Sequence, residues 1–261
     1  MNGSKISGVL LDLSGTLYSG DERIEGTRKC LAALRERNIA FRFLTNTTTK
    51  SLEEIAAKLD ALEIEVEIDW ILTPLAAARE RLMVDGFKTA ALFMANPVKK
   101  DLGDIIETED DPDVVIMGDL SDQFDYATLN RAFRLLAKGS AFYALAKNRC
   151  FESGGKLSLD LGPFIEALSY ASRKEPVCLG KPSPGFFQHA IKELNLPPEN
   201  IAVIGDDLET DVLGAMDCGL KGILVRTGKY NEELLRNSPR SPDAVIDSIE
   251  ELPSLLFAGS T

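Results

Sequence analysis

The stretch "ISGVLLDLSGTLY" at residues 6–18 joins a strand-like apolar run to a polar ending. The run Val9–Leu11 ends at Asp12, and Ser14 stands two residues further on, where a second carboxylate would make a catalytic pair. A carboxylate at the end of a buried strand is costly unless it has a partner. The stretch therefore predicts a buried strand over residues 6–12 and a partner for the charge of Asp12.

Length and charge limit the classes of function. With 261 residues the chain is long enough for one large domain or two modest ones. It carries 29 basic and 41 acidic residues, a net charge of −12, which argues against a nucleic-acid-binding protein. To bind a phosphorylated substrate, the protein would need a metal ion or a few cationic side chains at the site, because its overall electrostatic potential is unfavourable for an anion.

The sequence shows no strong pattern of a membrane span or of a disulfide or metal-binding cysteine motif. No apolar run approaches the roughly 20 residues that a membrane span requires. The cysteines Cys30, Cys150, Cys178 and Cys218 are far apart in the sequence and form no Cys-x-x-Cys pair, so we expect reduced thiols in a cytoplasmic protein. His189 is the single histidine, which leaves no histidine-cluster metal site and no obvious Ser-His triad.

Strand and helix patterns alternate along the chain, which indicates parallel β-α-β units and an α/β sheet with its ligand site at the carboxyl ends of the strands. Ser51 and Glu54 form a capping box that opens one helix, and Thr73-Pro74 and Ser183-Pro184 begin two others. The middle block, roughly 80–177, alternates in its own right and predicts an inserted second domain. The predicted strands are 6–12, 40–46, 89–94, 113–119, 140–147, 176–181, 200–207 and 221–228, and further helices are predicted over 26–37, 126–139, 162–174 and 209–218.

Four of the predicted strands end in polar groups that would converge if the strands lie in one parallel sheet. Carboxylates at such an edge can hold Mg²⁺ through oxygen ligands, and a glycine lets backbone N–H groups approach an anion. Taken singly, each ending also fits a plain role as a helix cap, a turn or a solvated cation. Together they predict a phosphate site with a metal and a nucleophilic carboxylate. The endings are Asp12-x-Ser14-Gly15-Thr16, Thr45-Asn46, Gly180-Lys181-Pro182, and Gly205-Asp206-Asp207 with Asp211.

The chain resembles the haloacid dehalogenase-like hydrolases, whose four motifs are matched by these endings. The long insert between the second and third motifs resembles the C2-type cap of the subclass that contains the NagD-like phosphatases. The resemblance covers essentially the whole chain and implies an α/β fold, with a parallel-sheet Rossmann-like hydrolase core and an inserted α/β cap domain. The implied boundaries are 1–79 and 178–261 for the core and 80–177 for the cap. Two branches of this subclass carry a serine at the position of Ser14.

The resemblance also implies a mechanism. Asp12 would attack phosphorus and form an aspartyl phosphate, with Lys181 as the second catalytic residue. Mg²⁺ would be held by Asp12, the backbone carbonyl of Ser14 and Asp206. The phosphoryl group would be bound by Ser14, Gly15, Thr45, Asn46 and Lys181, and the residues expected to surround the metal ligands are Thr16, Asp207 and Asp211.

Ser14 departs from the usual pattern of the family, in which a second aspartate protonates the leaving group. Such general acid catalysis is typically worth ~10²–10⁴ in rate. We therefore expect a bias toward activated leaving groups, as in pyrophosphate, aryl and acyl phosphates, or phosphoramidates such as phosphoamino acids. An acid from elsewhere, such as Asp207 or a cap residue, would remove this bias.

Two other functions stay open. The first is a pseudophosphatase that binds Mg²⁺ and a phosphorylated ligand for regulation, because Ser14 has removed turnover. The second is phosphonate or carbon–halogen cleavage on the same scaffold. Phosphonate chemistry would require a Schiff-base lysine in a small helical cap, which the long α/β insert does not suggest.

The insert contains a second strand ending of the same kind, "VVIMGDL" at 114–120. Sequence pattern alone does not choose between Asp119 and Asp206, and the resemblance favours Asp206 because Asp211 follows it. Within the insert, Lys147, Asn148 and Arg149 are candidates to grip an anionic substrate, or are exposed cations at a strand end. Tyr143 and Phe151 are expected in the insert's core. Relatives with this cap commonly pair through it, which suggests a homodimer.

Overall fold

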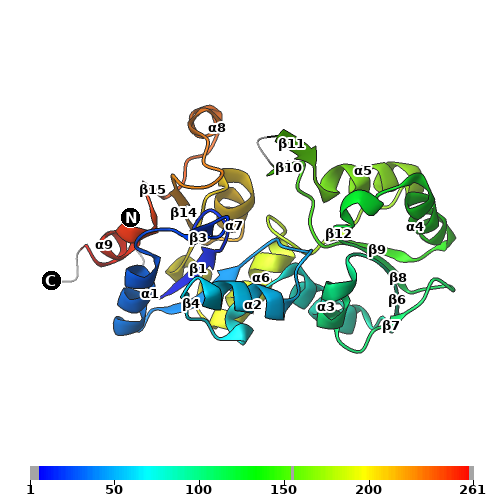
Figure 1. Ribbon diagram of the computed structural model, residues 1–261, viewed down its shortest axis with the longest axis horizontal. Helices are drawn as coiled ribbons and strands as arrows, with labels where there is room; N and C mark the ends of the chain where they lie inside the picture. Colours follow the sequence, from blue (N-terminus) through cyan, green and yellow to red (C-terminus); the bar gives the residue numbers. More distant parts are fainter. Residues whose placement is uncertain (1–5, 154–155, 259–261) are drawn as a thin grey trace. The chain divides into compact units, whose positions relative to one another are not determined.

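A computed structural model describes residues 6–153 and 156–258 (Figure 1). The chain divides into two compact units. One unit, called the core unit, comprises the described residues up to Thr45, Ile55–Leu72, and the described residues from Lys181 onward. The other, called the insert unit, comprises the described residues of Asn46–Glu54 and Thr73–Gly180. The domain boundaries expected from the resemblance, at 79/80 and 177/178, remain a prediction.

A parallel sheet forms the centre of the core unit, with its strands in the order β15-β14-β13-β1-β4-β5. All five residues of β1 are buried, as expected for a strand covered on both faces of a parallel sheet. The predicted strand over residues 6–12 is thereby confirmed. The strands are β1 (Gly8–Asp12), β4 (Ala40–Leu44), β5 (Ile71–Leu72), β13 (Ile201–Gly205), β14 (Lys221–Val225) and β15 (Ala244–Ile246).

The register of this sheet brings three polar endings to one edge. Asp12 lies opposite Leu44, the last residue of β4, and Leu11 lies opposite Ile204 of β13. The residues that follow these strands, Thr45 and Asp206, therefore leave the sheet on the side where Asp12 ends β1. β1 lies between β4 and β13, where the strand order reverses, which is the usual place for a ligand site in an open parallel sheet.

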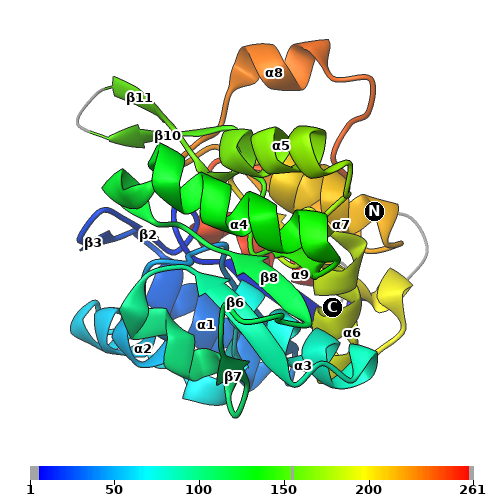
Figure 2. The same cartoon turned by 90° about the vertical axis from the view of Figure 1, so that its right-hand side faces the viewer.

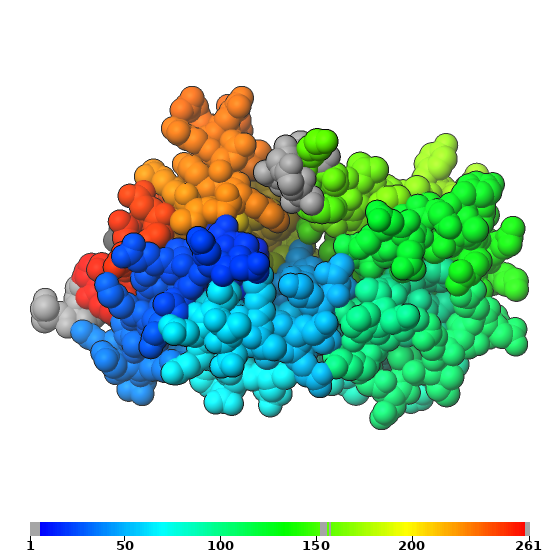
Figure 3. Space-filling view, viewed as in Figure 1, coloured from blue at the N-terminus to red at the C-terminus, as the bar shows by residue number. Residues whose placement is uncertain are grey.

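Helices and short turns connect the core strands. α1 contacts both β4 and α9, and α6 contacts both β4 and α7. None of the residues of α8 is buried, and this helix stands out in orange in the space-filling view (Figure 3). The predicted helix over 209–218 is present, but it begins as a π-helix, η5 (Leu208–Leu213), and continues as α7 (Gly214–Asp217). The other helices are α1 (Thr27–Glu36), α6 (Pro184–Leu194), α8 (Glu232–Asn237) and α9 (Leu252–Phe257), and short elements occur at β2 (Tyr18–Ser19), β3 (Glu22–Arg23), η1 (Ile68–Trp70), η4 (Pro198–Asn200) and η6 (Ile249–Glu251).

Two predicted helix starts are confirmed by their caps. Ser51 N–H donates to Glu54 Oε2 (2.7 Å), and Glu54 N–H donates to Ser51 Oγ (3.3 Å), which is the reciprocal pattern of a capping box. Thr73 Oγ1 accepts a hydrogen bond from Ala76 N–H (3.2 Å) at the start of α3. These caps begin α2 (Leu52–Ala61) and α3 (Pro74–Asp85).

The insert unit has its own parallel sheet, in the order β12-β9-β8-β6-β7. α4 and α5 lie side by side on one face of it (Figure 2), over a core that includes Val115, Leu136 and Ile165. Its strands are β6 (Thr89–Phe93), β7 (Ile106–Glu107), β8 (Val114–Met117), β9 (Ala141–Ala144) and β12 (Val177–Cys178), with the hairpin β10 (Cys150–Ser153) and β11 (Lys156–Leu159), the helices α4 (Tyr126–Lys138) and α5 (Leu161–Ser172), and the turns η2 (Asn96–Leu102) and η3 (Ser121–Gln123).

Two expectations about the insert unit are settled by burial and strand pairing. Tyr143 is buried as predicted, whereas the prediction for Phe151 is wrong, because this side chain lies on the hairpin and is 42% exposed. The strand predicted before Lys181 is also wrong in its extent and its sheet. β12 ends at Cys178 and pairs with β9, so Lys181 follows a strand of the insert sheet and not one of the core sheet.

No helix in the described part of the chain is both long and apolar enough to cross a membrane. All four cysteines are free thiols, of which Cys30 is buried and Cys150 is exposed.

Candidate active site

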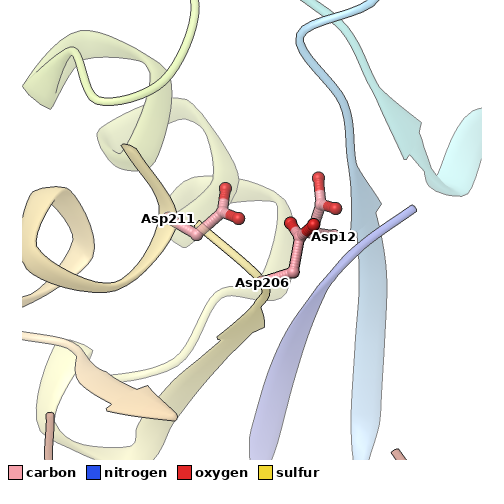
Figure 4. A group of neighbouring side chains, drawn as sticks. All are labelled: Asp12, Asp206 and Asp211. Atoms are coloured by element: carbon pink, nitrogen blue, oxygen red, sulfur yellow. The ribbon is translucent and has the colours of Figure 1, made fainter. Parts of the chain in front are cut away.

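Three carboxylates from separate positions in the sequence meet in the core unit (Figure 4). Asp12 ends β1, Asp206 follows β13, and Asp211 lies on η5. One carboxylate oxygen from each lies within 4.8 Å of the others, and all three residues are at most 6% exposed. We refer to Asp12, Asp206 and Asp211 as the acidic cluster.

Within the described part of the chain, one buried ammonium forms ion pairs with the acidic cluster. Lys181 is 4% exposed, and its Nζ lies 2.5 Å from Asp12 Oδ1 and 2.6 Å from Asp211 Oδ1. The endings at Asp12 and Lys181, which we expected to converge at the edge of one parallel sheet, lie together, although Lys181 does not follow a strand of the core sheet. Lys181 reaches it from the segment between β12 and α6.

The buried charge of this group is out of balance, because three carboxylates face one buried ammonium, while the exposed Lys229 acts on Asp206 from outside. Burial raises the pKa of Asp12 to about 8, with Asp211 and Asp206 adding to the rise and Lys181 opposing it. Burial likewise raises the pKa of Asp206 to about 6, with a further contribution from Asp211. For Lys181, burial alone would lower the pKa, but the neighbouring Asp12 and Asp211 raise it above its ordinary value.

The acidic cluster fits a divalent cation. If all three carboxylates are ionised, the group with Lys181 carries an excess of two negative charges in a buried place, where uncompensated charge is strongly unfavourable. Carboxylate oxygens are also the ligands that Mg²⁺ prefers in proteins. The donor set and its charge therefore match Mg²⁺.

Glycines allow the carboxylates to come this close to the backbone. A Cβ on Gly15, whose φ is +90°, would lie 1.9 Å from Asp206 Oδ2, and a Cβ on Gly228 would lie 2.0 Å from the same atom. A Cβ on Gly205 would lie 2.3 Å from Asp211 Oδ2. Any larger residue at these positions would displace a carboxylate of the acidic cluster.

The loop after Asp12 is folded back on itself. Leu17 N–H donates to the Leu13 carbonyl (2.9 Å), and Gly15 N–H donates to the Tyr18 carbonyl (2.7 Å). Ser14 is exposed at the surface of this loop. Thr16 is fully buried, and its Oγ1 has no hydrogen-bond partner among the described residues.

The segment Arg226–Tyr230, here called the 226–230 turn, follows β14 and was missed by the sequence reasoning. Lys229 N–H donates to Asp206 Oδ2 (2.7 Å), and Thr227 Oγ1 donates to the Gly15 carbonyl. β14 pairs with β13 in the same parallel sheet, so its carboxyl end lies at the same edge. The polar ending of "KGILVRTG" was the available signal, and it differs from the four motifs in having no acidic residue.

The second motif is divided between the two units. Thr45, in the core unit, is 4% exposed, and its N–H donates to the Leu72 carbonyl (3.2 Å). Asn46, in the insert unit, donates from Nδ2 to Asn148 Oδ1 (3.4 Å). A Cβ on Gly180 would lie 2.8 Å from Asn46 Oδ1, so this glycine permits the close approach of the Asn46 side chain.

Two further aspartates considered in the sequence analysis, Asp207 of the predicted site and Asp119 of the insert, accept hydrogen bonds from nearby backbone N–H groups. Asp207 caps the following helix, since its Oδ1 accepts from Glu209 N–H (3.1 Å) and Thr210 N–H (3.0 Å). Asp119, the alternative to Asp206, accepts from Ser121 N–H (2.6 Å) within the insert unit.

The candidate substrate residues of the insert have different surroundings. Lys147 forms an ion pair with Glu166 (Nζ to Oε1, 2.6 Å), whereas Arg149 is exposed. The backbone carbonyl of Asn148 accepts from Gly162 N–H (2.9 Å) near the start of α5. Of these three residues, Asn148 is therefore the one with a described contact to the second motif.

Comparison with known proteins places this site in a family. Residues 9–104 match the model of haloacid dehalogenase-like hydrolases, and residues 178–252 match a second model, described as HAD-hydrolase-like. Human haloacid dehalogenase-like hydrolase domain-containing protein 2 is 38% identical over 237 residues, which cover 90% of each chain. Human phospholysine phosphohistidine inorganic pyrophosphate phosphatase is 32% identical over 97% of this chain and 94% of its own. The chain belongs to the haloacid dehalogenase-like hydrolases, as the motifs predicted. A solved structure described as "putative nagD protein", 26% identical over 95% of this chain and 98% of its own with a TM-score of 0.86, agrees with the NagD-like subclass that the insert predicted.

Solved structures agree with the α/β architecture. A 4-nitrophenylphosphatase from Thermotoga maritima superposes with a TM-score of 0.88 at 28% identity, covering 95% of this chain and 97% of the other. NagD from the E. coli K-12 strain superposes with a TM-score of 0.85 at 23% identity, covering 95% and 98%. The predicted fold, a Rossmann-like hydrolase core with an inserted α/β cap, is thereby confirmed.

Proposed function

We propose that this chain is a Mg²⁺-dependent phosphatase that works through an aspartyl phosphate on Asp12. The observation that carries the proposal is the buried acidic cluster with the buried ammonium of Lys181 paired to Asp12 and Asp211. Asp12 and Asp206, with the backbone carbonyl of Ser14, would hold Mg²⁺, and the position of Asp211 in the cluster makes it a further candidate. Bound there, Mg²⁺ would neutralise negative charge as phosphoryl transfer proceeds.

The chemistry would run in two displacements. A carboxylate oxygen of Asp12 attacks phosphorus, and the bond from phosphorus to the leaving group breaks, with its electron pair departing on that group. Water then attacks the phosphorus of the aspartyl phosphate, the bond to Asp12 breaks with its electron pair remaining on the carboxylate oxygen, and the protons of the water stay on the phosphate or pass to the solvent. Inorganic phosphate and the Asp12 carboxylate are the products, so the residue is regenerated.

The remaining motif residues would hold the phosphoryl group. Lys181 would offset its charge, and Thr45 and Asn46 would donate hydrogen bonds to its oxygens. In the turn at Ser14-Gly15, the backbone N–H of Ser14 would donate to a phosphoryl oxygen, because the N–H of Gly15 is held by the Tyr18 carbonyl (2.7 Å). Positioning and charge neutralisation account for most of the rate in enzymes of this reaction type.

The exposed Ser14 supports a bias in substrate. A serine hydroxyl does not give up its proton at neutral pH, so the leaving group must depart with little assistance. Pyrophosphate, aryl phosphates, acyl phosphates and phosphoramidates meet this condition better than alkyl phosphates. The names of two relatives point to the same classes, since one acts on phospholysine, phosphohistidine and pyrophosphate and the other on 4-nitrophenyl phosphate.

A panel of phosphate compounds tests the proposal. We would measure Mg²⁺-dependent phosphate release from pyrophosphate, an aryl phosphate, an acyl phosphate, phosphohistidine and a sugar phosphate, with Asp12→Asn as the blank. Release from the activated compounds alone, lost in the variant, is the expected result. Equal release from the sugar phosphate would show that another group supplies the proton.

The serine also favours one alternative of a different class, a pseudophosphatase that binds Mg²⁺ and a phosphorylated ligand for regulation. This alternative would be favoured over the phosphatase if the protein binds phosphate in a Mg²⁺-dependent way but releases no phosphate from any compound and forms no phosphorylated Asp12. The role of residues 80–177 as a cap that selects the substrate, and a homodimer, remain proposals that rest on the resemblance.

A further inference from the structure

The 226–230 turn contacts two parts of the proposed metal site, although it contributes no residue to the acidic cluster. Lys229 donates its N–H to Asp206 Oδ2 (2.7 Å), and Thr227 donates its hydroxyl to the Gly15 carbonyl. We propose that this turn is a positioning element, which fixes the Asp206 carboxylate and the Gly15 peptide in the arrangement that binds Mg²⁺. The inference rests on the proposed function, because it assumes that Mg²⁺ binds at this cluster.

The hydrogen bond from Lys229 N–H fixes the orientation of the Asp206 carboxylate. Asp206 faces Asp211 and Asp12 in a buried place, and in the ionised form that binds a metal their mutual repulsion would favour a rotamer that separates them. The N–H of Lys229 holds one oxygen of Asp206 through a charge-assisted hydrogen bond, which is stronger than a neutral one. The carboxylate is therefore oriented before Mg²⁺ binds, so less free energy is spent on ordering this ligand during binding.

The second contact fixes the loop that carries Asp12 and Ser14. A Cβ on Gly228 would lie 2.6 Å from Gly15 Cα, so the two glycines meet backbone to backbone. The hydroxyl of Thr227 holds the Gly15 carbonyl beside this contact, and the N–H of Gly15 is held by Tyr18. Both polar groups of Gly15 are thus engaged, which sets the direction of the peptides that flank Ser14.

A pair of substitutions at Thr227 separates positioning from packing. Thr227→Val keeps the branched shape and removes the hydroxyl, whereas Thr227→Ser keeps the hydroxyl. We would titrate each full-length variant with MgCl₂ by calorimetry and follow the rise in thermal unfolding midpoint with Mg²⁺. We expect Thr227→Val to weaken Mg²⁺ binding roughly fivefold, the effect of one hydrogen bond, and Thr227→Ser to bind as the parent does.

Thr89→Val is the control for loss of a threonine hydroxyl. Thr89 Oγ1 donates to Asp113 Oδ2 (2.9 Å) within the insert unit, whereas the acidic cluster belongs to the core unit. This variant should keep the Mg²⁺ affinity of the parent. A role for Thr227 in stability alone would lower the metal-free midpoint and leave the Mg²⁺ affinity unchanged.

A second pair of variants tests the glycine contact and does not depend on Thr227. Gly228 and Gly20 have nearly the same φ, +59° and +57°, so an alanine meets the same backbone strain at both. At Gly20 nothing lies within 4 Å of the added Cβ, whereas at Gly228 it would strike Asp206 Oδ2. Gly228→Ala should therefore weaken Mg²⁺ binding roughly tenfold or more relative to Gly20→Ala.

Equal Mg²⁺ affinity in Thr227→Val, Thr227→Ser and the parent would overturn the role of Thr227. Equal affinity in Gly228→Ala and Gly20→Ala would overturn the role of the glycine contact. If the parent itself binds no Mg²⁺, the proposed function fails, and the inference fails with it. If the parent binds Mg²⁺ and releases no phosphate, the inference is still decided by the affinities, because they do not depend on turnover.

Discussion

Lys181 Nζ lies 2.5 Å from Asp12 Oδ1, although the two residues are 169 positions apart and the strand before Lys181 pairs within the insert sheet. The same Nζ lies 2.6 Å from Asp211 Oδ1. One ammonium thus contacts two of three buried carboxylates. The balance of charge at the site depends on this residue.

Removal of the Lys181 charge should destabilise the metal-free protein. Lys181→Met leaves three buried carboxylates without their contacting cation, and breaking a buried ion pair costs about 3–5 kcal/mol. Urea unfolding in the presence of a chelator measures the loss. Lys221→Met is the matched control, because its pair with Asp243 is partly exposed and should contribute about 1 kcal/mol or less. A loss for Lys181→Met no larger than for Lys221→Met would contradict the picture of a buried, unbalanced cluster.

The stability of the metal-free protein should fall as pH rises from about 5 to about 8. The folded protein has a raised pKa at Asp206, about 6, and at Asp12, about 8, so it holds protons that the unfolded chain has released. A raised pKa stabilises the fold below the unfolded value and loses that contribution as pH rises through the folded value. Urea unfolding with a chelator at several pH values measures the slope.

Saturating Mg²⁺ should flatten this pH dependence, because the metal takes the place of the protons. Carboxyl groups with a lowered pKa, such as those of Asp113 and Asp125, are ionised in both states above about pH 5 and do not add to the slope. The variant Asp206→Asn should show a shallower slope without Mg²⁺. A stability that rises between about pH 5 and pH 8 would show that the acidic cluster is not protonated in the way we infer.

Ser14→Asp should extend the range of substrates. Ser14 is exposed, so a carboxylate can replace it without a large burial cost. A new general acid should raise the rate on an alkyl phosphate by roughly 10²-fold, while the rate on an aryl phosphate changes much less. Ser14→Asn has a similar shape and no acid, and it should leave both rates near those of the parent. An equal change for both substrates would show that protonation of the leaving group is not what Ser14 limits.

Asn148→Ala should weaken phosphate binding through Asn46. The Asn148 side-chain oxygen accepts from Asn46 Nδ2 (3.4 Å), and its loss removes one of the contacts that orient the Asn46 amide. We expect KM for an aryl phosphate to rise a fewfold, roughly the effect of one neutral hydrogen bond, with a smaller change in kcat. Lys147→Met serves for comparison, because Lys147 is already paired with Glu166. A larger effect for Lys147→Met than for Asn148→Ala would make Lys147 the residue that contacts substrate.

Local signals in the sequence predicted several elements well. The capping box at Ser51 and Glu54 and the cap at Thr73 are confirmed in hydrogen bonds, because both ends of each bond lie within three residues. The strand that delivers Asp12 is confirmed because a continuous apolar run suits a strand buried on both faces. The prediction that Phe151 is buried was wrong because the exposure of a hairpin residue depends on residues distant in the sequence that pack against it, and not on local pattern.

The alternation of strands and helices, the caps and the polar residues at the strand ends could all be predicted from the sequence, since each follows from periodicity or from contacts a few residues long. Which of these polar groups meet is visible in the folded chain alone. The tertiary structure places Asp211 in the acidic cluster while Asp207 caps a helix, it brings Lys181 to Asp12 from a segment outside the core sheet, and it sets the 226–230 turn against Asp206. The reason is that such contacts depend on strand order and register, which join residues far apart in the chain and leave no periodic pattern in the sequence.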